Sequence, residues 1–109
     1  MRIALVAQNS PIAPHADTDS NSATARVASL AQALAQLGHR ITIYARRDAK
    51  ALPDSAILAP GVTVEHVTAG PPTPLDAEKL TSHLDEFGRH LAQHWSRSRP
   101  DVAHAPRLA

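Results

Sequence analysis

Four short apolar segments, separated by polar ones, predict β-strands along this chain. Residues 3–7 are continuously apolar, which is typical of a strand covered on both faces of a parallel sheet. Residues 41–45 and 62–67 alternate in the way that partly buried strands do. A fourth short strand is predicted at 101–105, where Pro106 stops it.

Apolar residues at every third or fourth position predict two amphipathic helices between these strands. The first spans residues 22–37, and Gly38 follows where a left-handed helix end is expected. Its apolar stripe is predicted to consist of Val27, Leu30, Ala31, Leu34 and Leu37. The second helix starts at Asp76 and ends before Pro100. Its apolar face is predicted to consist of Leu80, Leu84, Phe87, Leu91 and Trp95.

The remaining segments are polar and connect these elements. Residues 8–21 contain two prolines and many Asn, Asp and Ser residues, so we expect them to form a loop. Residues 46–60 are also polar and interrupted by proline, and we interpret them as a connection. The order β-α-β-β-α-β predicts an α/β fold. We expect a Rossmann-like three-layer α/β/α arrangement with a partial parallel sheet, its strands in the order 3-2-1-4.

Composition narrows the classes of function. The chain has 109 residues, which suits one small domain. Its net charge of +1 argues against a nucleic-acid partner, which would require a clear excess of Lys and Arg. The absence of cysteine excludes disulfides and thiolate metal sites. No apolar run is long enough for a membrane span or a signal-peptide core, so we expect a cytoplasmic protein.

The fourth predicted strand would lie beside the first, near the middle of an ordinary sheet of this type. Few residues follow it, so its outer side would expose unpaired N–H and C=O groups. We therefore expect the chain to be a truncated part of a larger domain, and to be only marginally stable alone.

Polar residues gather after the strands, where open α/β sheets bind their ligands. The candidates in the first loop are Asn9, Ser10, His15, Asp19, Asn21 and Ser22. Arg46 follows the second strand, and His104 belongs to the end of the fourth. Each candidate also has a structural interpretation, because Asn, Asp and Ser form turns and helix caps and arginines are commonly only solvated.

Metal and dinucleotide sites are not favoured. His90 and His94 are four residues apart, a spacing seen in metal sites, but they flank the apolar face and no Glu follows His90. The first loop lacks the Gly-x-Gly-x-x-Gly pattern of NAD-binding folds. We expect no metal and no cofactor.

Several segments resemble a known family. Residues 37–44 (LGHRITIY) and 99–105 (RPDVAHA) resemble the N-terminal domain of family-4 retaining glycosyltransferases, and residues 59–62 and 86–88 resemble a bacterial subgroup. These enzymes have the GT-B fold, in which two Rossmann-like domains face a cleft. The resemblance covers nearly the whole chain. It implies that residues 1–109 are part of the N-terminal, acceptor-side domain and that the donor-binding C-terminal domain is absent.

The resemblance also implies a chemistry. Such an enzyme transfers a sugar from a nucleoside diphosphate sugar to an acceptor hydroxyl with retention. Its donor-contacting residues lie in the second domain, so the resemblance implies no catalytic residue here, and we expect the chain alone to be inactive.

Two features depart from the family pattern. Asn21 and Ser22 stand where many members carry Gly-Gly, and Pro106 stands where a second His is common. The alternative is a stand-alone Rossmann or flavodoxin-like binding or interaction module without catalysis. Against it, the first loop has no Gly-rich or Ser/Thr-rich phosphate cradle.

Overall fold

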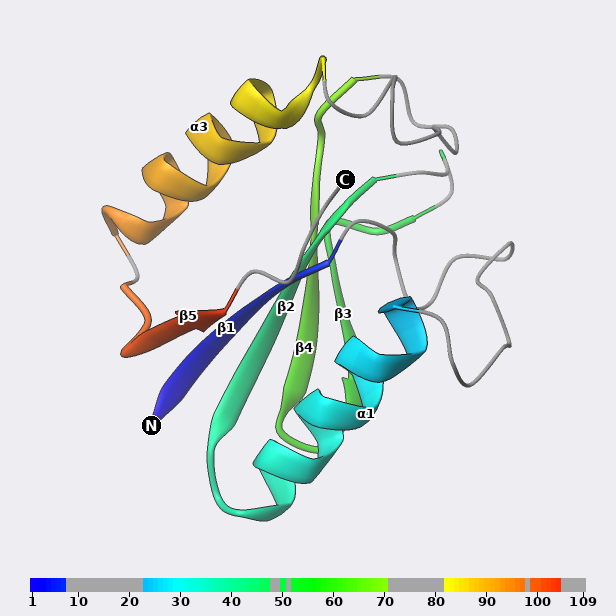
Figure 1. Cartoon of the computed structure of the whole chain (residues 1–109), viewed down its shortest axis with the longest axis vertical. Helices are drawn as coiled ribbons and strands as arrows, with labels where there is room; N and C mark the ends of the chain where they lie inside the picture. The colour runs from blue at the N-terminus through cyan, green and yellow to red at the C-terminus, as the bar shows by residue number, and fades with distance from the viewer. Residues whose placement is uncertain (8–22, 48–49, 51, 71–81, 98, 105–109) are drawn as a thin grey trace.

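The computed structural model describes residues 1–7, 23–47, 50, 52–70, 82–97 and 99–104. In chain order the elements are β1 (Arg2–Ala7), α1 (Ala23–Gln36), β2 (Arg40–Arg46), β3 (Ser55–Ala59), β4 (Val62–Val67), α3 (Leu84–Trp95) and β5 (Val102–His104). Figure 1 shows α1 and α3 on opposite sides of the strands. The expected three-layer arrangement is therefore confirmed.

The sheet has five strands in the order β3-β4-β2-β1-β5. The four predicted strands have the expected spatial order, and β4, β2, β1 and β5 run parallel to one another. The interpretation of residues 46–60 as a connection was wrong, because β3 lies there and pairs antiparallel with β4. Pro60 and Gly61 form the turn between them, and Gly61 has a φ of 81°. Pro followed by Gly suits the two central positions of a type II turn.

The core on the first face of the sheet forms under α1. Val27 and Ala31 of this helix pack against alternate residues of β1, β2 and β4, and Leu34 and Ala35 pack against the edge of the cluster. Leu30 and Leu37, both predicted in the apolar stripe, are instead 42% and 74% exposed. Leu37 lies past the last helical residue. Leu30 lies roughly a quarter turn from the middle of the buried face, at 100° per residue.

The second face is covered by α3. Phe87 and Leu91 are buried against residues of β1, β2 and the end of β4, and Trp95 packs at the rim of this cluster. The rings of Trp95 and Tyr44 meet edge to face, with centroids 5.6 Å apart. The predicted helix start at Asp76, and Leu80 with it, lie outside the described residues.

The end of α1 confirms the expected left-handed turn. Gly38 has a φ of 95°, and its N–H donates to the carbonyl of Ala35 at 3.0 Å. The N–H of Arg40 then donates to the carbonyl of Met1 at 3.0 Å, which brings the start of β2 beside the start of β1. The short turn therefore fixes α1 antiparallel to β1 and β2.

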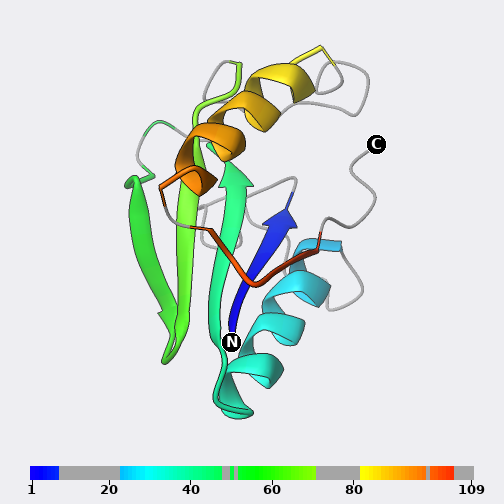
Figure 2. The same ribbon diagram turned by 90° about the vertical axis from the view of Figure 1, so that its left-hand side faces the viewer.

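The coverage of the two faces differs. Figure 2 shows α3 lying over the carboxyl-terminal parts of the strands. In the described part of the chain no helix covers their amino-terminal parts on that side. β5 is exposed at each of its residues, and Val102 keeps 45% of its surface exposed. Both features leave sheet surface open beside β1.

Candidate functional site

Four parallel strands have their carboxyl ends on the same side of the sheet, which is called the carboxyl edge below. β1 ends at Ala7, β2 at Arg46, β4 at Val67 and β5 at His104. The chain passes from β1 to β2 through α1 on one face, and from β4 to β5 through α3 on the other. The strand order therefore reverses between β1 and β5. Open α/β sheets bind ligands at such a switch point, outside the carboxyl ends of the strands.

The loop candidates are not described, but the elements on either side of them are. They lie in residues 8–22, outside the described residues, and comprise Asn9, Ser10, His15, Asp19, Asn21 and Ser22. The segment leaves the end of β1 at Ala7 and enters α1 at Ala23. Because the far end of α1 joins β2 at the amino edge, its first turn lies toward the carboxyl edge. Both attachment points therefore lie on the ligand side.

His104 lies at the same corner. It is the register partner of Leu5, whose side chain belongs to the cluster under α1. Register partners on adjacent strands share a face, so His104 lies on the α1 face, at the end of β5, and it is exposed. The fold thus brings His104 and the first turn of α1 to one edge and one face of the sheet.

Arg46 lies on the opposite face and is buried. It is two residues beyond Tyr44 on β2 and therefore shares the α3 face with it. Only 1% of its surface is exposed. Its Nη1 donates to the carbonyl of Arg47 at 3.2 Å and to that of Ala69 at 3.4 Å. The structure therefore does not bring Arg46 together with His104, and it ties the end of β2 to the segment after β4.

Residues 52–54 cover the edge beyond β2 and β4. Arg47 forms an ion pair with Asp54 and also donates to the carbonyl of Leu52. The Nδ1 of His66 lies 2.6 Å from the carbonyl oxygen of Pro53, and the N–H of His66 donates to the Asp54 carbonyl at 2.8 Å. This part of the edge is filled by the chain itself. Sequence reasoning missed the cluster, because its members come from three separate segments and follow no motif.

Two kinds of feature were searched for among the described residues and not found. Within them, no group of three or more His, Asp or Glu side chains is arranged to hold a metal ion. Neither α1 nor α3 has the length and apolar character needed to cross a bilayer.

Comparison with known proteins decides the family. A sequence profile described as Glycosyltransferase Family 4 matches residues 23–108, which is more than half of the chain. The chain belongs to glycosyltransferase family 4. The segments 37–44 and 99–105, which carry the resemblance in the sequence, both fall within the matched range.

Individual relatives of this family-4 chain are bacterial. A D-inositol 3-phosphate glycosyltransferase of Streptomyces coelicolor is 34% identical over 108 residues, which cover 95% of this chain and 24% of the relative. A D-inositol 3-phosphate glycosyltransferase 2 of Catenulispora acidiphila is 38% identical over 87 residues, covering 79% and 20%. The chain therefore spans about a quarter or less of the length of these relatives.

A solved structure supports the fold. Sucrose-phosphate synthase from Thermosynechococcus elongatus superposes with a TM-score of 0.82 at 24% identity. The match covers 95% of this chain and 26% of that protein. The expected Rossmann-like α/β fold of this family-4 chain is thus confirmed.

Proposed function

We propose that this chain is the acceptor-side, N-terminal part of a glycosyltransferase. The enzyme would transfer a sugar from a nucleoside diphosphate sugar to an acceptor hydroxyl, with retention of the anomeric configuration. A second domain, outside residues 1–109, would bind the donor. The observation that carries the proposal is the family match over residues 23–108, in a chain that spans about a quarter of its relatives.

The proposed contact site is the corner between β1 and β5. There the first turn of α1 directs toward the carboxyl edge backbone N–H groups that have no acceptor within the helix, and such groups favour an anion such as a phosphate group. Asn21 and Ser22 directly precede this turn in the sequence. His104 shares the edge and the face, and an imidazole can donate to or accept from an acceptor hydroxyl. Asn9, Ser10, His15 and Asp19 complete the proposed set.

For Arg46 the proposed contribution is indirect. Its guanidinium is buried and donates to the carbonyl of Ala69, so it holds the segment after β4 in place. The next residue, Gly70, donates its N–H to Oε2 of Glu86 in the first turn of α3, at 3.2 Å. Arg46 would therefore position Ala69 and Gly70, which follow β4 at the carboxyl edge.

The names of the relatives support a proposal for the acceptor class. Several are named for D-inositol 3-phosphate, and they match this chain over most of its length. We therefore propose that the acceptor of this enzyme is a phosphorylated polyol. Its phosphate would meet the start of α1, and its hydroxyl would face the donor domain.

The test begins with the DNA that flanks the coding sequence. The proposal expects a donor-binding domain to be encoded downstream, in the same or another frame, whereas unrelated coding sequence would contradict it. The longer protein is then incubated with D-inositol 3-phosphate and a panel of nucleoside diphosphate sugars. Mass spectrometry detects transfer, and NMR of the product gives the anomeric configuration. Absence of transfer with every donor, or an inverted product, would refute the corresponding part of the proposal.

The chain alone gives the complementary experiment. We expect no transfer from residues 1–109 under the same conditions. A stand-alone module would instead bind a mononucleotide tightly without transfer, and that result would favour the alternative function.

A further inference from the structure

The outer side of α1 carries an apolar strip that the sheet does not cover. This α1 strip consists of Leu30, Ala33 and Leu37, which recur at three- and four-residue spacing and therefore lie along one side of the helix. Leu30 keeps 42% of its surface exposed and Leu37, just past the last helical residue, keeps 74%. Ala33 is exposed as well. Exposed leucines are ordinary when scattered, whereas aligned ones form a continuous apolar surface that marks an interaction site.

The α1 strip faces away from both the sheet and the β3–β4 turn. Ala31 is fully buried against the sheet, and Ala35 is on the flank of α1 that approaches Gly61. Leu30 and Ala33 lie about 100–160° around the helix axis from Ala31, on the other flank. Figures 1 and 2 show no described helix or strand over the side of α1 that faces away from the sheet.

Charge is nearly absent from α1. The one charged residue within Ala23–Gln36 is Arg26, near the start of the helix. The exposed neighbours of the strip are uncharged polar residues, Ser29, Gln32 and Gln36. The solvent side of a surface helix ordinarily carries charged residues, whereas the centre of a protein–protein interface is depleted of them. The exposed side of α1 therefore has the composition of an interface.

A second copy of this chain fits the α1 strip. When two α1 helices pack antiparallel about a two-fold axis near Ala33, Leu30 of each copy lies beside Leu37 of the other. The small side chains of the two Ala33 residues then meet at the axis and let the helices approach closely. Arg26 of each copy lies near the carboxyl-terminal end of the other α1, where a cation is favourable, and far from its own symmetry mate.

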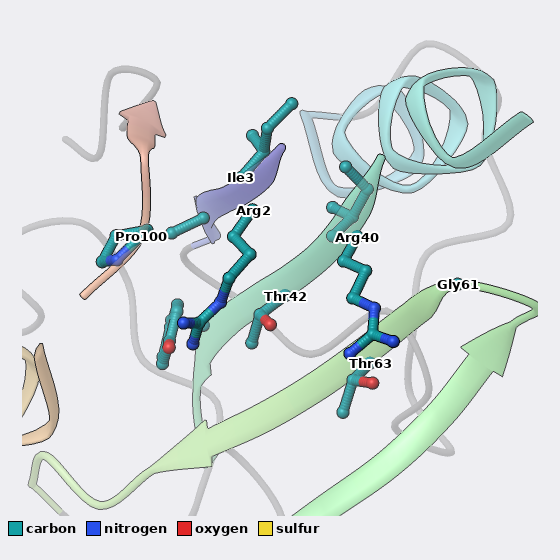
Figure 3. A pocket seen from close by; sticks show the side chains of 10 residues that line it. Arg2, Ile3, Arg40, Thr42, Gly61, Thr63 and Pro100 are labelled. Carbon is teal, nitrogen blue, oxygen red and sulfur yellow. The ribbon is translucent and has the colours of Figure 1, made fainter. Parts of the chain in front are cut away.

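The uncovered part of the α3 face is less suited to a second copy. It contains a hollow that Arg2 of β1 and Arg40 of β2 line. Figure 3 shows both arginine side chains extending from adjacent strands, with their guanidinium groups pointing apart. A two-fold contact through this face would bring four guanidinium groups into one interface, and like charges oppose such a contact. No such repulsion opposes contact through the α1 strip.

We infer that the α1 strip is the contact surface of a homodimer in which two α1 helices pack antiparallel. The helix has 14 residues and is therefore about 21 Å long. A contact confined to one helix of this length falls at the low end of interface sizes, below about 1,200 Å², where transient complexes are found. The dimer is therefore weak, and it does not depend on the proposed function.

The test is sedimentation equilibrium of the chain between about 1 μM and 1 mM, the range in which a weak complex dissociates. We expect the average mass to rise from the monomer value toward twice that value. Ala33→Glu and Ala33→Lys each place like charges at the two-fold axis and should weaken the dimer at least about tenfold. An equimolar mixture of these two variants should recover association, because opposite charges then meet.

Two further variants control for folding and for charge. Ala92→Glu makes the same change at an exposed position of α3 and should leave association unaltered. Leu37→Gln removes an apolar contact outside the helix and should weaken the dimer without adding charge. Ala33 is exposed and both Glu and Lys are good helix formers, so the urea midpoint of the dilute monomer should stay the same in the Ala33 variants.

The inference is overturned by a chain that stays monomeric at every concentration, or by unaltered association in Ala33→Glu and Leu37→Gln. A mixture of the Glu and Lys variants that stays monomeric also overturns it, because the two copies then do not meet at Ala33. The longer protein is measured in the same way and should dimerise with the same dependence on this position. If it is monomeric throughout, the inference is wrong, and a urea midpoint lowered by Ala33→Glu would show that another part of the same chain covers α1.

Discussion

Gly61 in the β3–β4 turn packs against Ala35 near the end of α1, and the Gly61→Ala substitution tests this close packing. Its carbonyl accepts the N–H of Ile41 at 2.9 Å, so the turn is also fixed to β2. A Cβ at this position would lie 3.2 Å from the Cβ of Ala35 and 3.7 Å from the carbonyl oxygen of His39. The substitution therefore adds both backbone strain and crowding.

Backbone strain and crowding can be separated by comparing Gly61→Ala with the same substitution at Gly38. At a φ of 81° an alanine is in the left-handed region, which costs about 1–2 kcal/mol. Gly38 has a φ of 95° and no atom within 4 Å of its added Cβ, so Gly38→Ala carries the strain alone. Moving Ala35 by a few tenths of an ångström adds about 1 kcal/mol for Gly61→Ala, at the low end of overpacking costs. That difference corresponds to roughly 4–8 °C in Tm for a domain of this size.

The assay is urea unfolding followed by the fluorescence of the single tryptophan, Trp95, which packs against the sheet. We expect the order of midpoints to be wild type, then Gly38→Ala, then Gly61→Ala. Gly88→Ala is the control of opposite sign. Gly88 lies within α3 with no atom within 4 Å of its added Cβ, so alanine should stabilise by about 1 kcal/mol. Equal midpoints for the Gly38 and Gly61 variants would refute the proposed crowding against Ala35.

The other predictions concern the core and the single tyrosine. Leu91→Ala should cost about 2–4 kcal/mol of unfolding free energy, because Leu91 of α3 is buried against the sheet. Leu37→Ala should change it by no more than about 0.5 kcal/mol, because Leu37 is exposed. Similar losses in the two variants, measured by urea unfolding, would contradict the assigned burial. Burial raises the pKa of Tyr44 above its ordinary value. Its contribution to stability is therefore complete below about pH 10 and is lost as the pH rises through the folded-state pKa. Tyrosinate absorbance reports this titration directly, because the chain has one tyrosine. Titration at the ordinary pKa in the folded chain, or the same alkaline loss of stability in Tyr44→Phe, would contradict it.

The strands and helices follow from the sequence where the apolar pattern is strong. β1 is an unbroken apolar run, and β2 and β4 alternate, so their pairing order could be predicted from the right-handed crossover rule. β3 was missed because its residues sit between Pro53 and Pro60 and bury little surface, with Ile57 80% exposed. The Pro60–Gly61 pair was the available signal for a hairpin.

Burial was harder to predict than secondary structure. The position of Leu30 in a three- and four-residue pattern does not show how wide the buried face of α1 is. Of the side chains of α1 that the structure describes, Val27, Ala31, Leu34 and Ala35 belong to the cluster against the sheet. The burial of Arg46 depends on the segment after β4, which no local pattern reveals.

The sequence was enough to predict where the candidate site lies, but not which residues contact one another there. The switch-point rule locates the edge between β1 and β5, and the register of His104 with Leu5 adds the face.

The most direct test of the central claim is the rate of sugar transfer by the longer protein carrying His104→Ala. His104 lies at the proposed acceptor corner, whereas His90 is exposed on α3, so His90→Ala is the matched control. The account predicts that His104→Ala lowers kcat/KM for the acceptor about tenfold or more, as the loss of a hydrogen bond to a reacting group would, and that His90→Ala leaves it unchanged. Unaltered transfer by His104→Ala, or an equal loss in both variants, would contradict an acceptor site at this edge.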